Sequence, residues 1–144
     1  MREETKEEFH LSMVNICHQI LPDLLNESDA YMAAAIYDKN HQRHLYFCRE
    51  NVVGQMIDPI ALICAGSIKF KMIDSQYQNL NCVIYSSESL PCKVLQVPIA
   101  KTGFLLKLAV KNNELLESSF ISLKKVISNI CTTFVDKHCA DLVH

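Results

Sequence analysis

The stretch from Leu80 to Val135 constrains the fold most, because its pattern predicts three strands followed by one long helix. The strands are expected at Leu80–Ser86, Cys92–Pro98 and Phe104–Val110, and clusters of turn-forming residues separate them. The third strand is almost continuously apolar, which is typical of a central strand that is covered on both faces. Apolar residues then recur at the spacing of a helix packed on a sheet: Leu116, Phe120, Leu123, Ile127, Ile130 and Phe134.

The first half of the chain predicts a helix followed by a hairpin. Apolar residues mark one helical face from Phe9 onward, and Pro22 is expected to end or bend this helix. Two short segments, Ala30–Tyr37 and His44–Arg49, flank a polar connection of five residues. Two short strands joined in this way indicate a hairpin.

A second helix is expected to begin at Asp58, with Asp58 as N-cap and Pro59 at the first helical position. Helical spacing of apolar residues continues through Met72, which places Gly66 inside this helix. A glycine there destabilises the helix by about 1 kcal/mol relative to alanine. A close-packed neighbour, either the sheet or a second subunit, would compensate for that loss. Residues 74–79 are expected to form a polar loop.

These elements predict an α+β fold, an α/β sandwich with the order helix-β-β-helix-β-β-β-helix. The sheet is expected to be antiparallel and five-stranded, with helices flanking it. At 144 residues the chain is long enough for one hydrophobic core. We therefore expect a single domain over residues 1–144, with its core at about 6–135 and a C-terminal extension at 136–144.

Composition narrows the classes of partner. The net charge is −2, which argues against nucleic acid or an anionic membrane as the main partner, because a phosphate backbone requires a basic face. No apolar run approaches the roughly 20 residues that span a bilayer. The first eight residues are charged and mostly acidic, unlike a signal peptide. A cytoplasmic location without direct membrane insertion is therefore expected.

No motif in the sequence predicts a catalytic site. The seven cysteines include no C-x-x-C pair, and most are expected to be small buried hydrophobes in a reducing compartment. His44 and Cys48 face the same side of a strand, but zinc needs four ligands and no second pair accompanies them. Three glycines build no phosphate-binding loop. We therefore expect no catalytic residue, no cofactor and no metal, and a protein that is not an enzyme.

The order of elements resembles that of the roadblock family, named for a dynein light chain. Leu24–Asp38 resembles the family's first helix end, loop and strand, which closes on an Asp at the hairpin. Thr102–Asn113 resembles its last strand and Leu115–Ile130 its final helix. Lys39-Asn40 stands where the family usually has a glycine, and Glu114–Glu117 where the last helix often opens with Asn-Leu-Gly. The chain thus resembles a divergent member.

The resemblance implies a roadblock/profilin-like fold and a non-catalytic, dimeric scaffold or adaptor. Roadblock proteins pack their second helices together and join their sheets edge to edge. They serve small Ras-like GTPases or larger trafficking, motility or secretion complexes, so the implied partners are a second copy or a paralogue and a protein of that kind. The implied dimer interface comprises Ile60, Ile63, Cys64, Ser67 and Lys71 of the second helix, together with Asn81, Val83 and Tyr85 of an expected edge strand at Asn81–Tyr85. Residues on the helix would otherwise be expected to pack on the chain's own sheet.

Two other functions stay open at this point. Ligand-sensing domains of the GAF or profilin-like kind also flank an antiparallel sheet with helices, although they usually have longer connections that roof a pocket. A cysteine-based redox protein is the other alternative. It predicts one thiol that reacts much faster than the others, because reactivity follows the thiolate fraction.

Overall fold

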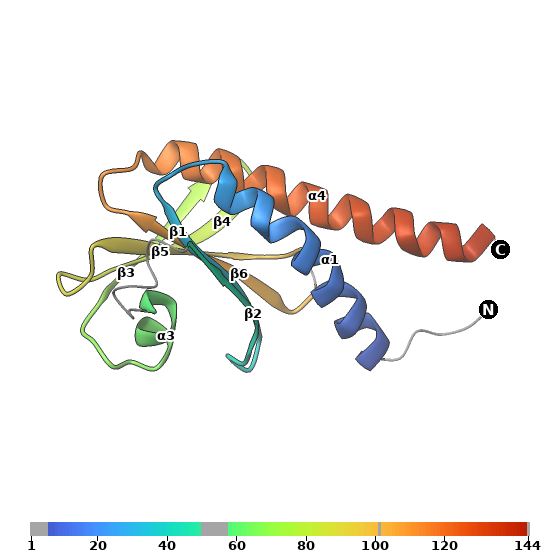
Figure 1. Cartoon of the computed structure of the whole chain (residues 1–144), viewed down its shortest axis with the longest axis horizontal. Coiled ribbons are helices and arrows are strands. Elements are labelled where there is room, and N and C mark those ends of the chain that lie inside the picture. The colour runs from blue at the N-terminus through green and yellow to red at the C-terminus, as the bar shows by residue number, and fades with distance from the viewer. Residues whose placement is uncertain (1–5, 50–57, 101, 144) are drawn as a thin grey trace.

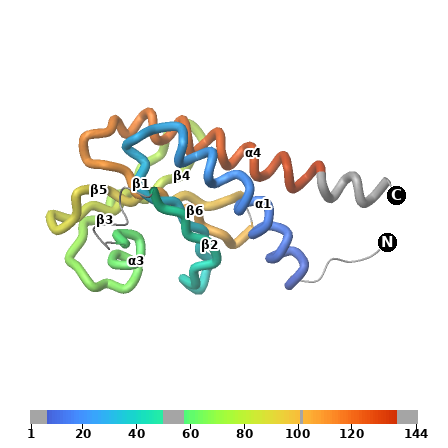
Figure 2. Tube along the Cα trace, viewed as in Figure 1, coloured from blue at the N-terminus to red at the C-terminus, as the bar shows by residue number. Residues whose placement is uncertain are grey.

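In the computed structural model, which describes residues 6–49, 58–100 and 102–143, a six-stranded antiparallel sheet lies between helices (Figure 1). Figure 2 traces the same path along the backbone. The elements are α1 (Lys6–Asn26), β1 (Tyr31–Asp38), β2 (Arg43–Cys48), α3 (Pro59–Cys64), β3 (Lys71–Tyr77), β4 (Leu80–Ser86), β5 (Cys92–Pro98), β6 (Phe104–Lys111) and α4 (Leu116–Val143). The predicted α+β class with an antiparallel sheet flanked by helices is confirmed.

The strands lie in the order β2-β1-β6-β5-β4-β3, so the first and last described strands, β1 and β6, pair inside the sheet. Every residue of β1 is buried, because β2 and β6 pair with its two sides and helices cover both faces. The alanines at 33–35 have weak strand propensity. Their small side chains suit this position, where both faces of the strand are closely packed.

The described residues form a sheet of six strands, and the prediction of five was wrong. The helix expected to begin at Asp58 is α3, and it ends at Cys64 instead of continuing through Met72. Met72 belongs to β3, which also takes up most of the segment that was expected to be a polar loop at 74–79. The apolar residues beyond Cys64 therefore have helical spacing by coincidence and do not form a helix.

Gly66 is the physical reason why α3 is short. It adopts a left-handed conformation with φ of +66°, which an L-residue with a side chain rarely takes. The N–H of Gly66 donates to the carbonyl of Ile63 at 3.1 Å, and the N–H of Ser67 donates to that of Leu62 at 3.0 Å. These two bonds form a Schellman motif, which closes the C-terminal end of a helix.

Two apolar clusters divide the core. α1 and α4 lie side by side on one face of the sheet, and their apolar residues pack with that face (Figure 1). α3 lies on the opposite face, where Ile60 and Ile63 join a smaller cluster (Figures 1 and 2). Pro22 does not end α1, which continues to Asn26. α3 has six residues and therefore covers much less of its sheet face than α1 and α4 cover of the opposite face.

Candidate interaction surface

β3 forms one edge of the sheet and is the most exposed strand among the described residues. It pairs with β4 on one side, and in the described part of the chain no strand pairs with its other side. Met72 is 60% exposed and Ile73 is 56% exposed. A free strand edge presents unpaired backbone N–H and C=O groups, which are a template for pairing with another chain.

Exposed apolar residues of β3 point to both faces of the sheet. Met72 lies opposite Tyr85 of β4, which packs in the cluster around α3. Ile73 lies opposite Ile84, which belongs to the cluster under α1 and α4. Directly opposed residues share a face, so Met72 extends the α3 face and Ile73 extends the other. The apolar surface of the edge is therefore continuous with both clusters.

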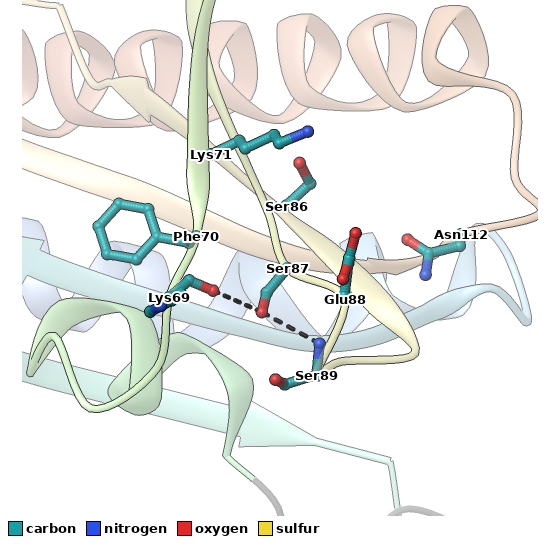
Figure 3. A pocket seen from close by; sticks show the side chains of 8 residues that line it. All are labelled: Lys69, Phe70, Lys71, Ser86, Ser87, Glu88, Ser89 and Asn112. Carbon is teal, nitrogen blue, oxygen red and sulfur yellow. Dashed lines mark hydrogen bonds between the residues drawn. The ribbon is translucent and has the colours of Figure 1, made fainter.

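A surface depression of about 520 Å³ lies where the chain enters β3 (Figure 3). Its lining is mostly exposed and polar: Lys69, Phe70, Lys71, Ser86, Ser87, Glu88, Ser89 and Asn112. The Ser87 hydroxyl donates to the carbonyl of Lys69 at 2.7 Å and accepts from the N–H of Ser89 at 3.2 Å. These bonds tie the start of β3 to the turn between β4 and β5.

Phe70 also helps to place the entry to β3. Its ring lies against that of Tyr85, with 5.5 Å between the centroids and an edge-to-face orientation. Figure 3 shows Phe70 and Lys71 pointing to opposite sides of the chain at this entry. The side chains around the depression therefore position the edge strand, and they include no convergent set of catalytic groups.

Asp58 fixes the start of α3 to the sheet. One of its carboxylate oxygens accepts from the N–H of Ala61 at 3.0 Å and so caps the helix. Both oxygens accept from the Arg43 guanidinium of β2, at 2.6 and 3.1 Å. The guanidinium also lies over the rings of Tyr46, at 4.2 Å, and Tyr37, at 5.3 Å. Burial raises the pKa of both phenols to about 12, so they are neutral at pH 7.

The end of α3 meets a buried lysine. Lys107 lies in β6 opposite Ala35, on the α3 face, and is 4% exposed. Its Nζ lies 2.8 Å from the Sγ of Cys64 and 4.3 Å from the centroid of the Tyr37 ring. Sequence reasoning missed this contact, because the two residues lie 43 positions apart and neither belongs to a motif.

The helix residues of the implied dimer interface lie in two environments. Ile60 and Ile63 are buried against the chain's own sheet, whereas Cys64 and Ser67 are exposed. Burial of the two isoleucines agrees with the simpler expectation that this helix packs on its own sheet. The exposed pair lies at the end of α3 and just beyond it.

The strand residues of that interface do not form the edge. Asn81, Val83 and Tyr85 belong to β4, which lies between β3 and β5, so the expectation of an edge at 81–85 was wrong. Lys71 is in the edge strand itself and not on the helix. β3 takes the place of the predicted edge. The implied dimer interface as such stays a prediction.

His44, which shares a strand face with Cys48, contacts a carboxylate of the same hairpin. The Nε2 atom of His44 lies 2.9 Å from Oδ2 of Asp38, within the hairpin. The described residues contain no group of three or more His, Cys, Asp or Glu side chains that could hold a metal ion. No helix in the described ranges has the length and apolar character to cross a membrane.

Comparison with known proteins gives a fold but no sequence family. No protein-family model matches the chain, and no curated protein matches it in sequence. MglC from Myxococcus xanthus is similar in structure, with a TM-score of 0.55 at 10% identity over 80% of this chain and 96% of that one. Myxococcus xanthus MglB gives a TM-score of 0.50 at 16% identity over 94% of each chain. These similarities support a roadblock-like fold.

Proposed function

We propose that this chain is a non-catalytic scaffold of roadblock type that works in the cytoplasm. In this proposal it dimerises with a second copy or a paralogue, and the dimer regulates or anchors a small Ras-like GTPase or a larger trafficking, motility or secretion complex. The roadblock-like fold supports the class of protein. The observation that carries the proposal is the exposed edge of β3, with Met72 and Ile73 on it, which no described strand pairs.

The geometry of the edge supports self-association through β3. Two copies of β3 related by a two-fold axis perpendicular to the sheet pair antiparallel and make one continuous sheet. Such a pair satisfies the free backbone groups of both edges. The same operation keeps the two α3 helices on one face, with Met72 of each copy beside the new seam. It also covers part of the Met72 and Ile73 side chains, which the single chain exposes.

Light scattering over a concentration series tests the dimer. We expect the wild-type mass to rise to twice the 16.4 kDa of one chain. The double variant Met72→Lys/Ile73→Lys should stay at the mass of one chain, because lysines on an edge oppose strand pairing. Leu11→Lys is the matched control: Leu11 is 62% exposed but lies on α1, away from β3. Circular dichroism checks that all three proteins are folded.

Two outcomes contradict this part of the proposal. If the wild type stays monomeric at every concentration, self-association is wrong. If the double lysine variant dimerises as well as the wild type, the dimer does not use β3. A dimer that the Leu11→Lys control weakens equally would likewise remove the assignment to the edge strand.

Binding to a GTPase needs its own assay. We expect pull-down against a panel of small Ras-like GTPases, loaded with GDP or a non-hydrolysable GTP analogue, to retain at least one of them in one nucleotide state. Loss of binding in the double lysine variant but not in Leu11→Lys would show that the GTPase needs the dimer. No retention of any GTPase in either nucleotide state would count against the GTPase role while leaving the scaffold role to the dimer experiment.

A further inference from the structure

Lys107 is unusual among the described lysines, because it is the one that is buried. It lies in the middle of β6, and the residues beside it in the neighbouring strands are Ala35 and Gln96. Among the described residues no carboxylate lies within ion-pair distance of its Nζ. A buried charge is costly unless a partner compensates it. The groups that do contact the ammonium are therefore informative.

Two groups contact the Lys107 ammonium in the described part of the chain. The ring of Tyr37 presents its face at 4.3 Å, which is a favourable cation–π contact but carries no net charge. The thiol of Cys64 lies at 2.8 Å and is the contact that can become an anion. A thiolate there would complete an ion pair with the buried ammonium, and a neighbouring cation favours the thiolate over the thiol.

The C-terminal end of α3 weakly opposes this stabilisation of a thiolate at Cys64. Cys64 is the last residue of α3, where the helix dipole places a partial negative charge that disfavours an anion. That partial charge is about half an elementary charge for a long helix, and α3 has six residues. The Lys107 ammonium carries a full charge and lies 2.8 Å from the sulfur.

Solvent exposure distinguishes Cys64 from the other described cysteines. Cys64 is exposed, whereas Cys17, Cys82 and Cys92 are buried. Burial raises the pKa of Cys17 to about 12 and those of Cys82 and Cys92 to about 11, so these thiols stay protonated at pH 7. Burial also raises the pKa of Cys131.

We propose that Cys64 is the reactive thiol of this chain, that the Lys107 ammonium beside it stabilises the attacking sulfur, and that hydroperoxides oxidise it. The thiolate sulfur attacks one oxygen of the hydroperoxide, so that an S–O bond forms and the O–O bond breaks. The sulfur loses two electrons and becomes a sulfenic acid. With hydrogen peroxide the other oxygen leaves as hydroxide, which takes up the proton lost by the thiol and becomes water. Lys107 is a positioning residue in this reaction and is not consumed.

Site-resolved labelling of the intact, reduced chain tests the assignment. The protein, at the lowest concentration of the light-scattering series, is treated with hydrogen peroxide and dimedone, which traps sulfenic acids. Peptide mass spectrometry then gives the rate at each of the seven cysteines. We expect Cys64 to be labelled about tenfold faster than any other cysteine, since reactivity follows the thiolate fraction. Equal rates at Cys64 and Cys48, or a faster rate at any other cysteine, would overturn the proposal.

Variants of Lys107 test the role of the ammonium. Lys107→Met should slow labelling of Cys64 by about tenfold, and Lys107→Arg should restore most of the rate because it keeps the cation. Lys111→Met is the control: it removes a positive charge from the same strand at an exposed position and should leave the rate unchanged. If folded Lys107→Met reacts at the wild-type rate, Lys107 has no such role. If that variant does not fold, the wild-type ranking and the arginine variant decide.

Discussion

Replacing Asp58 tests what holds α3 against the sheet. Its carboxylate both caps the helix, through the N–H of Ala61, and pairs with the Arg43 guanidinium. Asp58→Asn keeps an oxygen that can cap the helix and loses the charge of the pair. Asp58→Ala loses both interactions. The two variants therefore separate the cap from the ion pair.

The expected magnitudes follow from these two contacts. Loss of an N-cap side chain costs about 1 kcal/mol of stability. The Arg43 and Asp58 side chains of the pair are 28% and 31% exposed, and partly exposed pairs contribute about 0.2–1 kcal/mol. Two parallel hydrogen bonds and the packing of the guanidinium on Tyr46 place this pair near the top of that range. We expect losses of about 2 kcal/mol for Asp58→Ala and about 1 kcal/mol for Asp58→Asn.

Urea unfolding monitored by circular dichroism measures these losses as free energies of unfolding. Arg43→Met is the companion variant, because it removes the pair and leaves the cap. It also removes the hydrogen bond that Nε of Arg43 donates to the Tyr37 hydroxyl at 2.9 Å, so its loss should be at least that of Asp58→Asn. The double variant Arg43→Met/Asp58→Asn should lose less than the sum of the single variants, since both remove one interaction. Equal losses for Asp58→Asn and Asp58→Ala would refute the contribution of the cap. Strict additivity in the double variant would refute the contribution of the pair.

Two further predictions concern the turns. Gly66→Ala should lower the free energy of unfolding by about 1–2 kcal/mol, because alanine at φ +66° is strained, and urea unfolding measures this. A hydrogen bond with His44, and others from the backbone N–H groups of Gln42 and Asn40, lower the pKa of Asp38 from 3.8. A lowered pKa gives stability that is present above 3.8 and is lost as the pH falls through the lower folded value. Unfolding titrations from pH 7 into acid should therefore show a smaller loss for Asp38→Asn than for the wild type, and equal losses would contradict this.

The sequence predicts the buried part of the fold well. β4 and β5 have the predicted bounds, and β6 ends one residue later than predicted, at Lys111. Each of these strands has buried residues on at least one face, and turn-forming residues lie at its ends. Burial therefore produces a recognisable pattern of apolar residues in the sequence. The prediction of a covered central strand at β6 is confirmed for the same reason.

β3 escaped prediction because it is exposed on both faces. Neither face requires apolar residues, so its sequence shows no alternation. The apolar residues beyond Cys64 happened to continue the helical spacing of α3, and this concealed the boundary. The available signal was Gly66, since a glycine near the end of an apolar helical pattern is typical of a helix C-terminus.

The contact between Cys64 and Lys107 could not be predicted from sequence. A lysine within the apolar run of β6 is visible in the sequence, and so is a cysteine on the second helix. What joins them is the packing of a six-residue helix across the sheet, which depends on Gly66 and on the Asp58–Arg43 pair. Local patterns carry no information about which of the seven cysteines faces that lysine.

The exposed apolar residues of β3 limit the free energy that the proposed dimer can gain. Full burial of a methionine or isoleucine side chain contributes about 1.5–3 kcal/mol, and Met72 and Ile73 are each a little more than half exposed. Burying both residues in two copies thus contributes about 4–7 kcal/mol. Association costs about 4–15 kcal/mol in lost translational and rotational freedom, so this apolar burial does not by itself make a tight dimer. Backbone pairing along β3 and contacts near the end of α3 must supply the remaining free energy of association. A dimer held by the edge alone would have a Kd of about 1 mM, so the concentration series should extend to that concentration.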